Sequence, residues 1–300
     1  MTTVVGTVPR LPGFLQWVAA PIAAERLAAW RIGVGLVLLL DAILFYCPML
    51  RGQLYGPTSL EGPGVFAERF AAPHWNWSLL NWLPVEWGAT VLVSVWIVCA
   101  SLLLIGWRPN VAAAVAWAIS LSFYNSNFYL HNSGDRLRHF VLLLLIFAKT
   151  DAAWAWRRRP REGAWPVLVS GWPMRVMLLQ MALMYFMNGV YKLQGRIWWE
   201  GSVMWYVNHD LAWARWSSPW MPYWVTAALT WFALVWEVGF PVWLTLPRLR
   251  TIALLIGVAF HVFTFFHLEI AAFPLWALCL YLPLLPIREA ATRRVSGEER

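Results

Sequence analysis

Long apolar runs separated by short charged loops dominate this 300-residue chain and leave few ways for it to fold. Hydrophobic residues make up 60% of the sequence and charged residues only 13%, whereas soluble domains lie nearer half and a quarter. A chain with so few charges cannot cover a water-soluble surface, and it is far too apolar to be intrinsically disordered. The composition therefore predicts an integral membrane protein surrounded by lipid.

Eight apolar segments approach the length that crosses a bilayer as a helix, which is about 20 residues. Neither the alternation of a β-barrel nor an internal repeat is visible. We therefore expect an all-α, polytopic transmembrane bundle of about eight spans, with residues 1–300 forming a single membrane domain. The last two spans are short and closely joined, which is typical of a hairpin. The predicted spans are residues 28–45, 87–105, 111–129, 138–156, 174–193, 221–246, 251–267 and 271–287.

Basic residues orient these spans, because cytoplasmic loops carry an excess of Lys and Arg. Arginines gather most densely at 157–161, whereas Arg136 and Arg138 are among the few basic residues left for the outer side. Both termini are then expected in the cytoplasm of a protein integral to the cell (inner) membrane, with 1–24 cytoplasmic or interfacial and 288–300 as a cytoplasmic tail. The N-terminus has no signal-peptide pattern, and residues 13–29 fit an interfacial amphipathic helix.

Several function classes lack their signatures. The sequence has neither HExxH nor paired Cys and His at ligand spacing, so no metal site is predicted. Walker A, GxGxxG and GxSxG motifs are also missing. The net charge of +8 is spread over short loops, so no nucleic-acid binding is expected. The three cysteines are too far apart in sequence to predict a disulfide framework.

Two long outer segments, 47–86 and 194–220, are rich in Trp. Trp favours the headgroup level of a membrane, where one end of its ring is wet. These segments are therefore expected to form interfacial helices, to cap an outward-facing cavity, or to do both.

Ionisable side chains inside the predicted spans are rare and usually face the bundle interior. Arg31 and Asp41 lie on the first span and are interpreted as structural polar residues. Glu237 on the sixth span and His261 on the seventh are candidates for a substrate or cofactor pocket. The alternative is that all four form buried pairs that hold helices together, and the sequence does not assign those pairs.

Lys192 is the candidate catalytic residue. Tyr185, Asn188 and Lys192 are spaced by three, four and seven residues, which places them on one helical face at the outer end of the fifth span. An amine in a water-poor pocket loses its proton more easily and can act as a base. The alternative is a lysine that extends to the interface, although this does not explain the aligned Asn and Tyr.

A second polar cluster covers residues 124–139, YNSNFYLHNSGDRLRH, around a predicted turn. Asn125, His131 and Asp135 are candidates for the rim of an outward-facing pocket. Asn, Ser, Gly and Asp also favour turns and helix caps, so a solvated turn is the alternative.

The segment at 185–209, YFMNGVYKLQGRIWWEGSVMWYVNH, resembles the signature of vitamin K-dependent γ-carboxylases and of their bacterial relatives, the horizontally transferred transmembrane (HTTM) family. The resemblance also covers AAWRIGVGLVLLLD in the first span, NSNFYLHNSGDRL before the fourth and GVAFHVFTFF in a late helix, so it extends over about residues 25–287. The matching positions in the 185–209 signature are Gly189, Lys192, Leu193, Trp198 or Trp199, Glu200 and Gly201.

The resemblance implies a carboxylase- or epoxidase-like mechanism. In the carboxylases a lysine amine deprotonates a reduced naphthoquinone, oxygen addition yields a strong base that removes a γ-proton from a peptide glutamate, and carbon dioxide traps the carbanion. Lys192 matches that lysine. The implied cofactor is therefore a vitamin K-like reduced naphthoquinone, and the implied partner is a secreted peptide.

The chain also departs from the carboxylases. It ends soon after its last predicted span, where they carry a large extramembrane region, and a histidine expected after the fourth span is replaced by AKTDAAWAW. Short HTTM proteins include relatives of the maturation factors for a sporulation-delaying toxin. The alternative function is therefore a non-enzymatic maturation, export or immunity partner for a secreted peptide toxin, working with a small partner protein.

Overall fold

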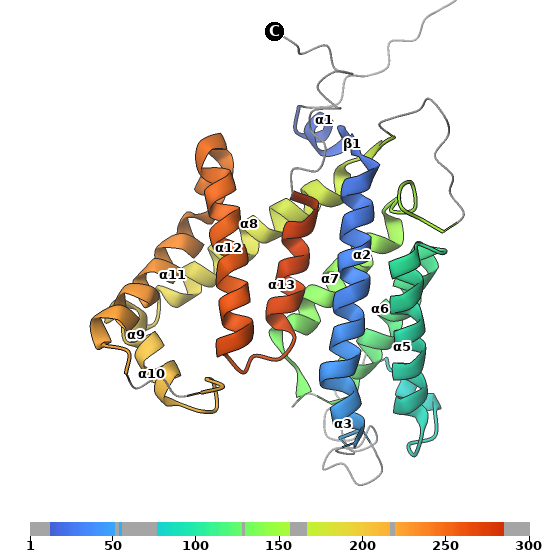
Figure 1. Ribbon diagram of the computed structural model, residues 1–300, viewed down its shortest axis with the longest axis horizontal. Helices are drawn as coiled ribbons and strands as arrows, with labels where there is room; N and C mark the ends of the chain where they lie inside the picture. Colours follow the sequence, from blue (N-terminus) through green and yellow to red (C-terminus); the bar gives the residue numbers. More distant parts are fainter. Residues whose placement is uncertain are drawn as a thin grey trace, which may run out of the picture.

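The computed structural model of the chain describes residues 13–51, 54–55, 77–127, 130–156, 167–216 and 220–284. Helices account for nearly all of the regular structure in these residues (Figure 1). Each of the eight predicted spans overlaps a helix, which confirms the all-α membrane bundle. The helices are α2 (Ala24–Asp41), α5 (Gly88–Ile105), α6 (Pro109–Ser126), α7 (Ser133–Phe147), α8 (Trp172–Lys192), α11 (Tyr223–Thr245), α12 (Pro247–His267) and α13 (Phe273–Tyr281).

Four helical segments in the described residues are long and apolar enough to cross a membrane by length and composition, and the chain is accordingly an integral membrane protein. The remaining helices are shorter or more polar, as in α13, whose nine residues continue into the 3-10 turn Leu282–Leu284. The four segments are Ala24–Arg51, Gly88–Ile105, Tyr223–Thr245 and Arg248–His267.

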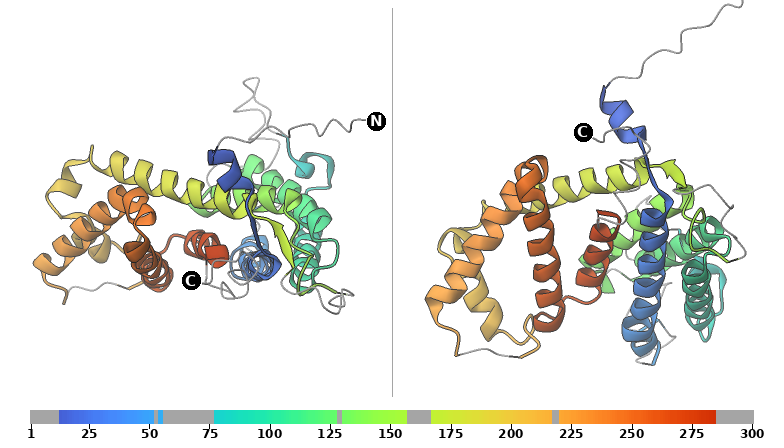
Figure 2. Two further views of the ribbon diagram at one scale, coloured as in Figure 1. Left: turned by 90° about the horizontal axis from the view of Figure 1, so that it is seen from above. Right: turned by 45° about the horizontal axis from the view of Figure 1, so that its top comes forward.

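Helix α8 connects two groups of helices. It runs obliquely along one side of the bundle, from the group formed by α2, α5, α6, α7 and α13 to α11 and α12 (Figure 2). Its main packing partner is α11. Helices α12 and α13 lie next to each other and pack together, as expected for a hairpin (Figure 1). This arrangement brings the end of α8 against the middle of α11.

The N-terminal segment differs from its prediction. Residues 13–29 do not form one interfacial helix, because α1 (Gly13–Ala19) ends before Pro21 and α2 begins at Ala24. Between them β1 (Pro21–Ala23) pairs antiparallel with β2 (Leu168–Ser170). Proline has no N–H and disfavours helix continuation, so the chain extends here and pairs with the segment that precedes α8.

The outer segments contain short helices. Residues 77–86 include the 3-10 helix Leu79–Trp82, and the second Trp-rich segment contains α9 (Arg196–Trp199) and α10 (Val203–His209). Much of the first outer segment lies outside the described residues.

Helix α7 begins and ends earlier than residues 138–156. Asn132 Oδ1 accepts from the Gly134 N–H and Asp135 Oδ2 accepts from the Asn132 N–H, both at 2.8 Å, so a capping box starts the helix at Ser133. Arg138 therefore does not stand at the start of the helix, as the predicted span 138–156 has it, but lies one turn inside and is fully buried.

Arg138 is the centre of a buried polar cluster. Its guanidinium donates to Asp41 Oδ2 at 2.7 Å, to Asp135 Oδ1 at 2.6 Å, to Ser120 Oγ at 2.6 Å and to the Tyr46 hydroxyl at 2.9 Å. These partners come from α2, its π-helical continuation Ala42–Tyr46, α6 and α7 itself. The Arg138 cluster therefore ties three helices together inside an apolar core.

Other contacts complete this core. Trp276 Nε1 on α13 donates to Asp41 at 2.7 Å, and the Trp96 ring on α5 lies 4.8 Å from the Arg138 guanidinium. Arg31 is also buried, but it donates to the Trp154 carbonyl at 2.6 Å and does not pair with Asp41. The two polar residues predicted on the first span thus hold different parts of the bundle.

The membrane orientation is testable with single cysteines at the two ends of α7. In a Cys47→Ser background, Arg136→Cys should react with an impermeant thiol reagent in intact cells, because positive-inside orientation places this end outside. Lys149→Cys should react only after permeabilisation. Both positions are exposed, whereas Cys99 and Cys279 are buried. The reverse labelling pattern would show that the orientation is inverted.

Candidate functional site

An ion pair joins α8 to α11. Lys192 Nζ donates to both carboxylate oxygens of Glu237 at 2.6 Å. The Glu237 side chain is only 5% exposed, whereas that of Lys192 is 25% exposed. The carboxylate is therefore hidden between helices, while the amine remains open to a ligand. The Lys192–Glu237 pair is the first element of the candidate site.

Gly189 brings the two helices close enough for this pair. A β-carbon on Gly189 would lie 2.7 Å from Val238 Cγ2 and 2.8 Å from the Val238 nitrogen. Real β-carbons do not approach backbone atoms so closely, so only glycine fits here. Because Gly189 lies one turn before Lys192 and Val238 follows Glu237, the backbone contact sets the position of the pair.

Gly189→Ala should separate α8 from α11 and lower the stability of the protein. We expect a loss of about 1–3 kcal/mol from overpacking, larger than the roughly 1 kcal/mol that alanine gains in helix propensity. Thermal unfolding of the purified protein measures it. Gly13→Ala is the control, because no atom lies within 4 Å of a β-carbon there. An unchanged unfolding midpoint for Gly189→Ala would contradict the close approach.

The residues that follow Lys192 differ in their relation to it. The Trp198 ring lies 4.7 Å from Lys192 Nζ, a cation–π distance. Trp199 is exposed and donates to the Leu193 carbonyl at 2.6 Å. Glu200 accepts from Arg196 at 2.5 Å and has no recorded contact with Lys192. Of the aromatic pair in the sequence, the structure therefore places Trp198 at the amine.

A buried hydrogen-bonded cluster lies deeper in the bundle. The Tyr185 hydroxyl is 2.5 Å from His261 Nε2 and 2.7 Å from the Tyr281 hydroxyl. All three side chains are buried, and they come from α8, α12 and α13. The Tyr185 ring also packs on Trp236 at 4.7 Å, one residue before Glu237. The Tyr185–His261–Tyr281 cluster therefore borders the helix that carries the ion pair.

Sequence reasoning missed Tyr281. It lies in an apolar span with no polar residue at helical spacing, so only the fold brings it to Tyr185. Its hydroxyl occupies the space that a β-carbon on Gly257 would take, 2.0 Å away. The nearby GVAFH pattern, which places Gly257 four residues before His261, was the available signal of a crowded helix face.

Asn188 does not converge with its two predicted neighbours. Lys192 and Tyr185 both face α11, but Asn188 is exposed on α8. The one-face pattern therefore holds for Lys192 and Tyr185, which are separated by two helical turns.

The turn before α7 lines a cavity of about 600 Å³ at one end of the bundle. His131 stacks on the Tyr124 ring at 3.8 Å and hydrogen bonds to the Tyr124 carbonyl. Both line the cavity, with Arg136 and Glu269. Asn125 instead donates to the Trp77 carbonyl at 2.8 Å. Asp135 accepts hydrogen bonds from the Asn132 N–H in the helix cap and from the Arg138 guanidinium. Of the three predicted rim residues, the structure places only His131 in the cavity wall.

A neighbouring cavity of about 400 Å³ lies under α9 and α10 and shares Trp213 with the first. Backbone hydrogen bonds hold the wall between them, from the Glu269 N–H to the Trp213 carbonyl at 2.7 Å and from the Arg215 N–H to the His267 carbonyl at 3.0 Å. His267 Nε2 also lies 2.8 Å from Asn208 Oδ1. Two cavities at one end of the bundle thus lie beside the segment that follows Lys192.

The geometry of the Lys192–Glu237 pair is compatible with proton transfer. An accessible amine with a hidden carboxylate partner can take and pass a proton. Within the described ranges, no three side chains of His, Cys, Asp or Glu converge in a way that could hold a metal ion.

Comparison with known proteins agrees with the sequence motifs. The chain is 29% identical over 120 residues to the uncharacterized protein YitO of Bacillus subtilis, a match covering 38% of this chain and 39% of that protein. The chain thus spans well under half of that relative's length. No solved structure matches the chain. The family model for the HTTM domain matches residues 20–286, which include every helix of the bundle from α2 to α13. The chain therefore belongs to the HTTM domain family.

Proposed function

We propose that this HTTM protein is a membrane enzyme in which Lys192 acts as a base on a lipid-soluble acid at the outer face of the bacterial inner membrane. The observation that carries the proposal is the Lys192–Glu237 pair, with both carboxylate oxygens 2.6 Å from Nζ and only the amine open to a ligand. Both termini are cytoplasmic in this proposal, as the arginine distribution predicts.

Glu237 gives Lys192 a place for its proton. The Glu237 carboxylate lies beneath the amine and is nearly closed off, so it is the group placed to accept a proton from Lys192. A hydrogen bond already joins the two groups at 2.6 Å, so a proton can pass from the amine to the carboxylate without any rearrangement of the helices. Lys192 then presents a free amine to a ligand, while Glu237 holds the proton beneath it.

The residues around the amine fit a reduced naphthoquinone. Trp198 offers an aromatic face next to Nζ, and the amine is the polar group that can meet a ring hydroxyl. When bound, such a quinol supplies an acidic hydroxyl and a ring that reacts with oxygen. Lys192 would take the hydroxyl proton, and Trp198 would orient the ring.

The outer cavities suit a peptide substrate. Together they offer apolar walls, with Trp213 between them, and charged groups in Arg136 and Glu269. Such a mixture of apolar walls and charged groups favours a peptide that carries both apolar and charged side chains. The same cavities also favour the second candidate function, a non-enzymatic partner that holds a secreted peptide toxin during maturation or export.

Product formation in a defined membrane separates these two functions. The full chain in lipid nanodiscs is supplied with a chemically reduced naphthoquinone and oxygen, and the naphthoquinone epoxide is quantified by mass spectrometry. The proposal predicts epoxide that depends on the protein and is lost in Lys192→Ala. If epoxide does not exceed that in empty nanodiscs while a secreted peptide encoded beside the gene binds the protein, the non-enzymatic function is favoured.

A further inference from the structure

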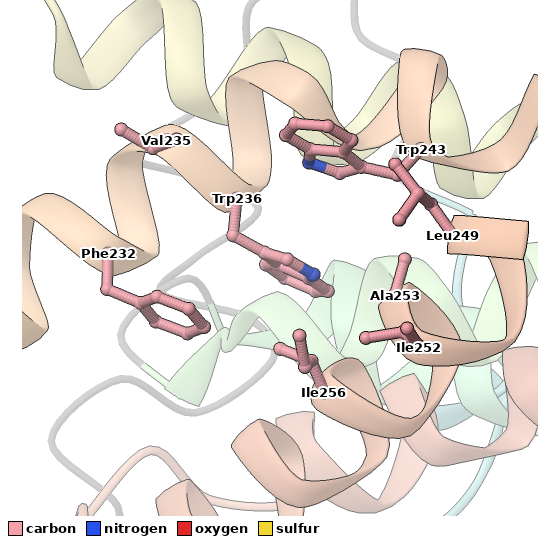
Figure 3. Close-up of a pocket in the computed structure, with 8 residues that line it drawn as sticks. All are labelled: Phe232, Val235, Trp236, Trp243, Leu249, Ile252, Ala253 and Ile256. Atoms are coloured by element: carbon pink, nitrogen blue, oxygen red, sulfur yellow. The ribbon is translucent and has the colours of Figure 1, made fainter. Parts of the chain in front are cut away.

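A membrane-facing groove lies between α11 and α12. It is an apolar cavity of about 210 Å³ with its mouth formed by exposed side chains, among them Phe232, Val235 and Ile252. Its floor is formed by Trp236 and Ala253, which are each only 4% exposed (Figure 3). This volume is below that of a typical ligand pocket, so the groove fits part of a ligand whose remainder lies in the bilayer.

One buried polar atom in this floor has no partner. Trp236 Nε1 makes no hydrogen bond within the described part of the chain. Figure 3 shows the Trp236 ring lying across the groove, with its nitrogen on the edge that faces α12. An N–H without an acceptor in an apolar, lipid-facing site is costly, since neither water nor lipid chains can satisfy it. The groove therefore suits a ligand with one acceptor oxygen.

The depth of Trp236 narrows the kind of ligand. Trp236 is nine residues from the Thr245 end of α11 and thirteen from the Tyr223 end, which corresponds to about 14 Å and 20 Å of helix. On α12 the same groove extends to Leu249, near the turn between the two helices. The occupant therefore has an apolar body that fills this length, with its acceptor oxygen at Trp236.

We propose that this groove is the entry site for a prenylated quinone, with its carbonyl oxygen accepting from Trp236 Nε1 and its chain lying along Phe232 and Val235. The chemical class rests on the proposed function. Glu237 follows Trp236 by about a quarter-turn of helix, so the groove and the Lys192–Glu237 pair lie on adjacent faces of α11. A quinone from the bilayer would thus meet α11 before it reaches the amine.

Native mass spectrometry of the purified full chain tests this site without any turnover. The probe is a naphthoquinone with a four-unit prenyl chain, titrated against each variant. Ala253→Phe fills the floor and should weaken binding by more than about tenfold, the effect of losing a good steric fit. Trp236→Phe removes the N–H together with part of the ring, keeps an aromatic floor, and should weaken binding about five- to tenfold. Ala259→Phe, exposed on the same helix and outside the groove, should bind as the parent does.

Three results would overturn the proposal. The first is that Ala253→Phe binds the quinone as tightly as the parent protein does. If Ala253→Phe does not fold, Ile252→Trp at the mouth of the groove replaces it in this test. Another is parental affinity in Trp236→Phe. The third is co-purification of a phospholipid in place of the added quinone, unaffected by Trp236→Phe. Lys192→Ala should still bind the quinone in the groove but should form no epoxide. The binding measurement therefore tests the groove, and epoxide formation separately tests Lys192 as the base.

Discussion

Arg138→Met should destabilise the protein by about 3–5 kcal/mol, the largest stability effect that we expect. The substitution removes the partner of two buried carboxylates, Asp41 and Asp135, and leaves them unpaired in an apolar core. Arg138→Lys should recover only part of the loss, because an ammonium cannot reproduce the fork of four donor contacts. Thermal unfolding monitored by circular dichroism in detergent measures both variants.

Arg136→Met is the matched control for this series. It lies two residues earlier on α7, is exposed, and should change stability by less than about 0.5 kcal/mol. Equal effects at the two arginines would mean that the Arg138 cluster contributes nothing specific.

Lys192→Arg should lower epoxide formation by about 10²- to 10⁴-fold, the range that a positioned base contributes. Arginine keeps the charge and can still pair with Glu237, so folding should persist, but a guanidinium does not release its proton. Lys149→Arg changes the only other lysine of the chain and should leave activity unchanged. Product rates in nanodiscs, taken with unfolding midpoints of the same preparations, measure both effects.

Near-parental activity of Lys192→Arg would contradict the proposal that Lys192 acts as a base. It would mean that charge and reach are sufficient, as for a lysine that merely extends to the interface.

The helices could be predicted because apolar length alone selects a membrane helix. Their ends were less predictable, since local chemistry sets them. The box between Asn132 and Asp135 starts α7 five residues before the apolar run, and Pro21 turns part of an expected helix into a strand. The pairing of Arg138 with Asp41 could not be predicted, because the two residues are 97 positions apart and sequence spacing carries no geometry over that separation.

The candidate site was predictable only where its residues are close together in the sequence. Lys192 stood out through its spacing from Tyr185 and through the family signature, whereas its partner Glu237 was only one of several intramembrane charges. The pairing depends on the glycine contact between helices that are far apart in sequence. The groove beside Trp236 depends on how α11 packs on α12, and an apolar helix of this kind gives no sequence signal of a gap in its packing.

Exchanging the two charged residues tests the central claim most directly. Lys192→Glu combined with Glu237→Lys keeps a possible ion pair between α8 and α11 but moves the amine to the buried position. Unfolding midpoint and epoxide formation are measured on the same nanodisc preparation, beside Lys192→Ala. The account predicts that the exchange recovers most of the stability lost in Lys192→Ala and none of its activity. Recovery of both would contradict it, because the pair would then serve only to hold the two helices together.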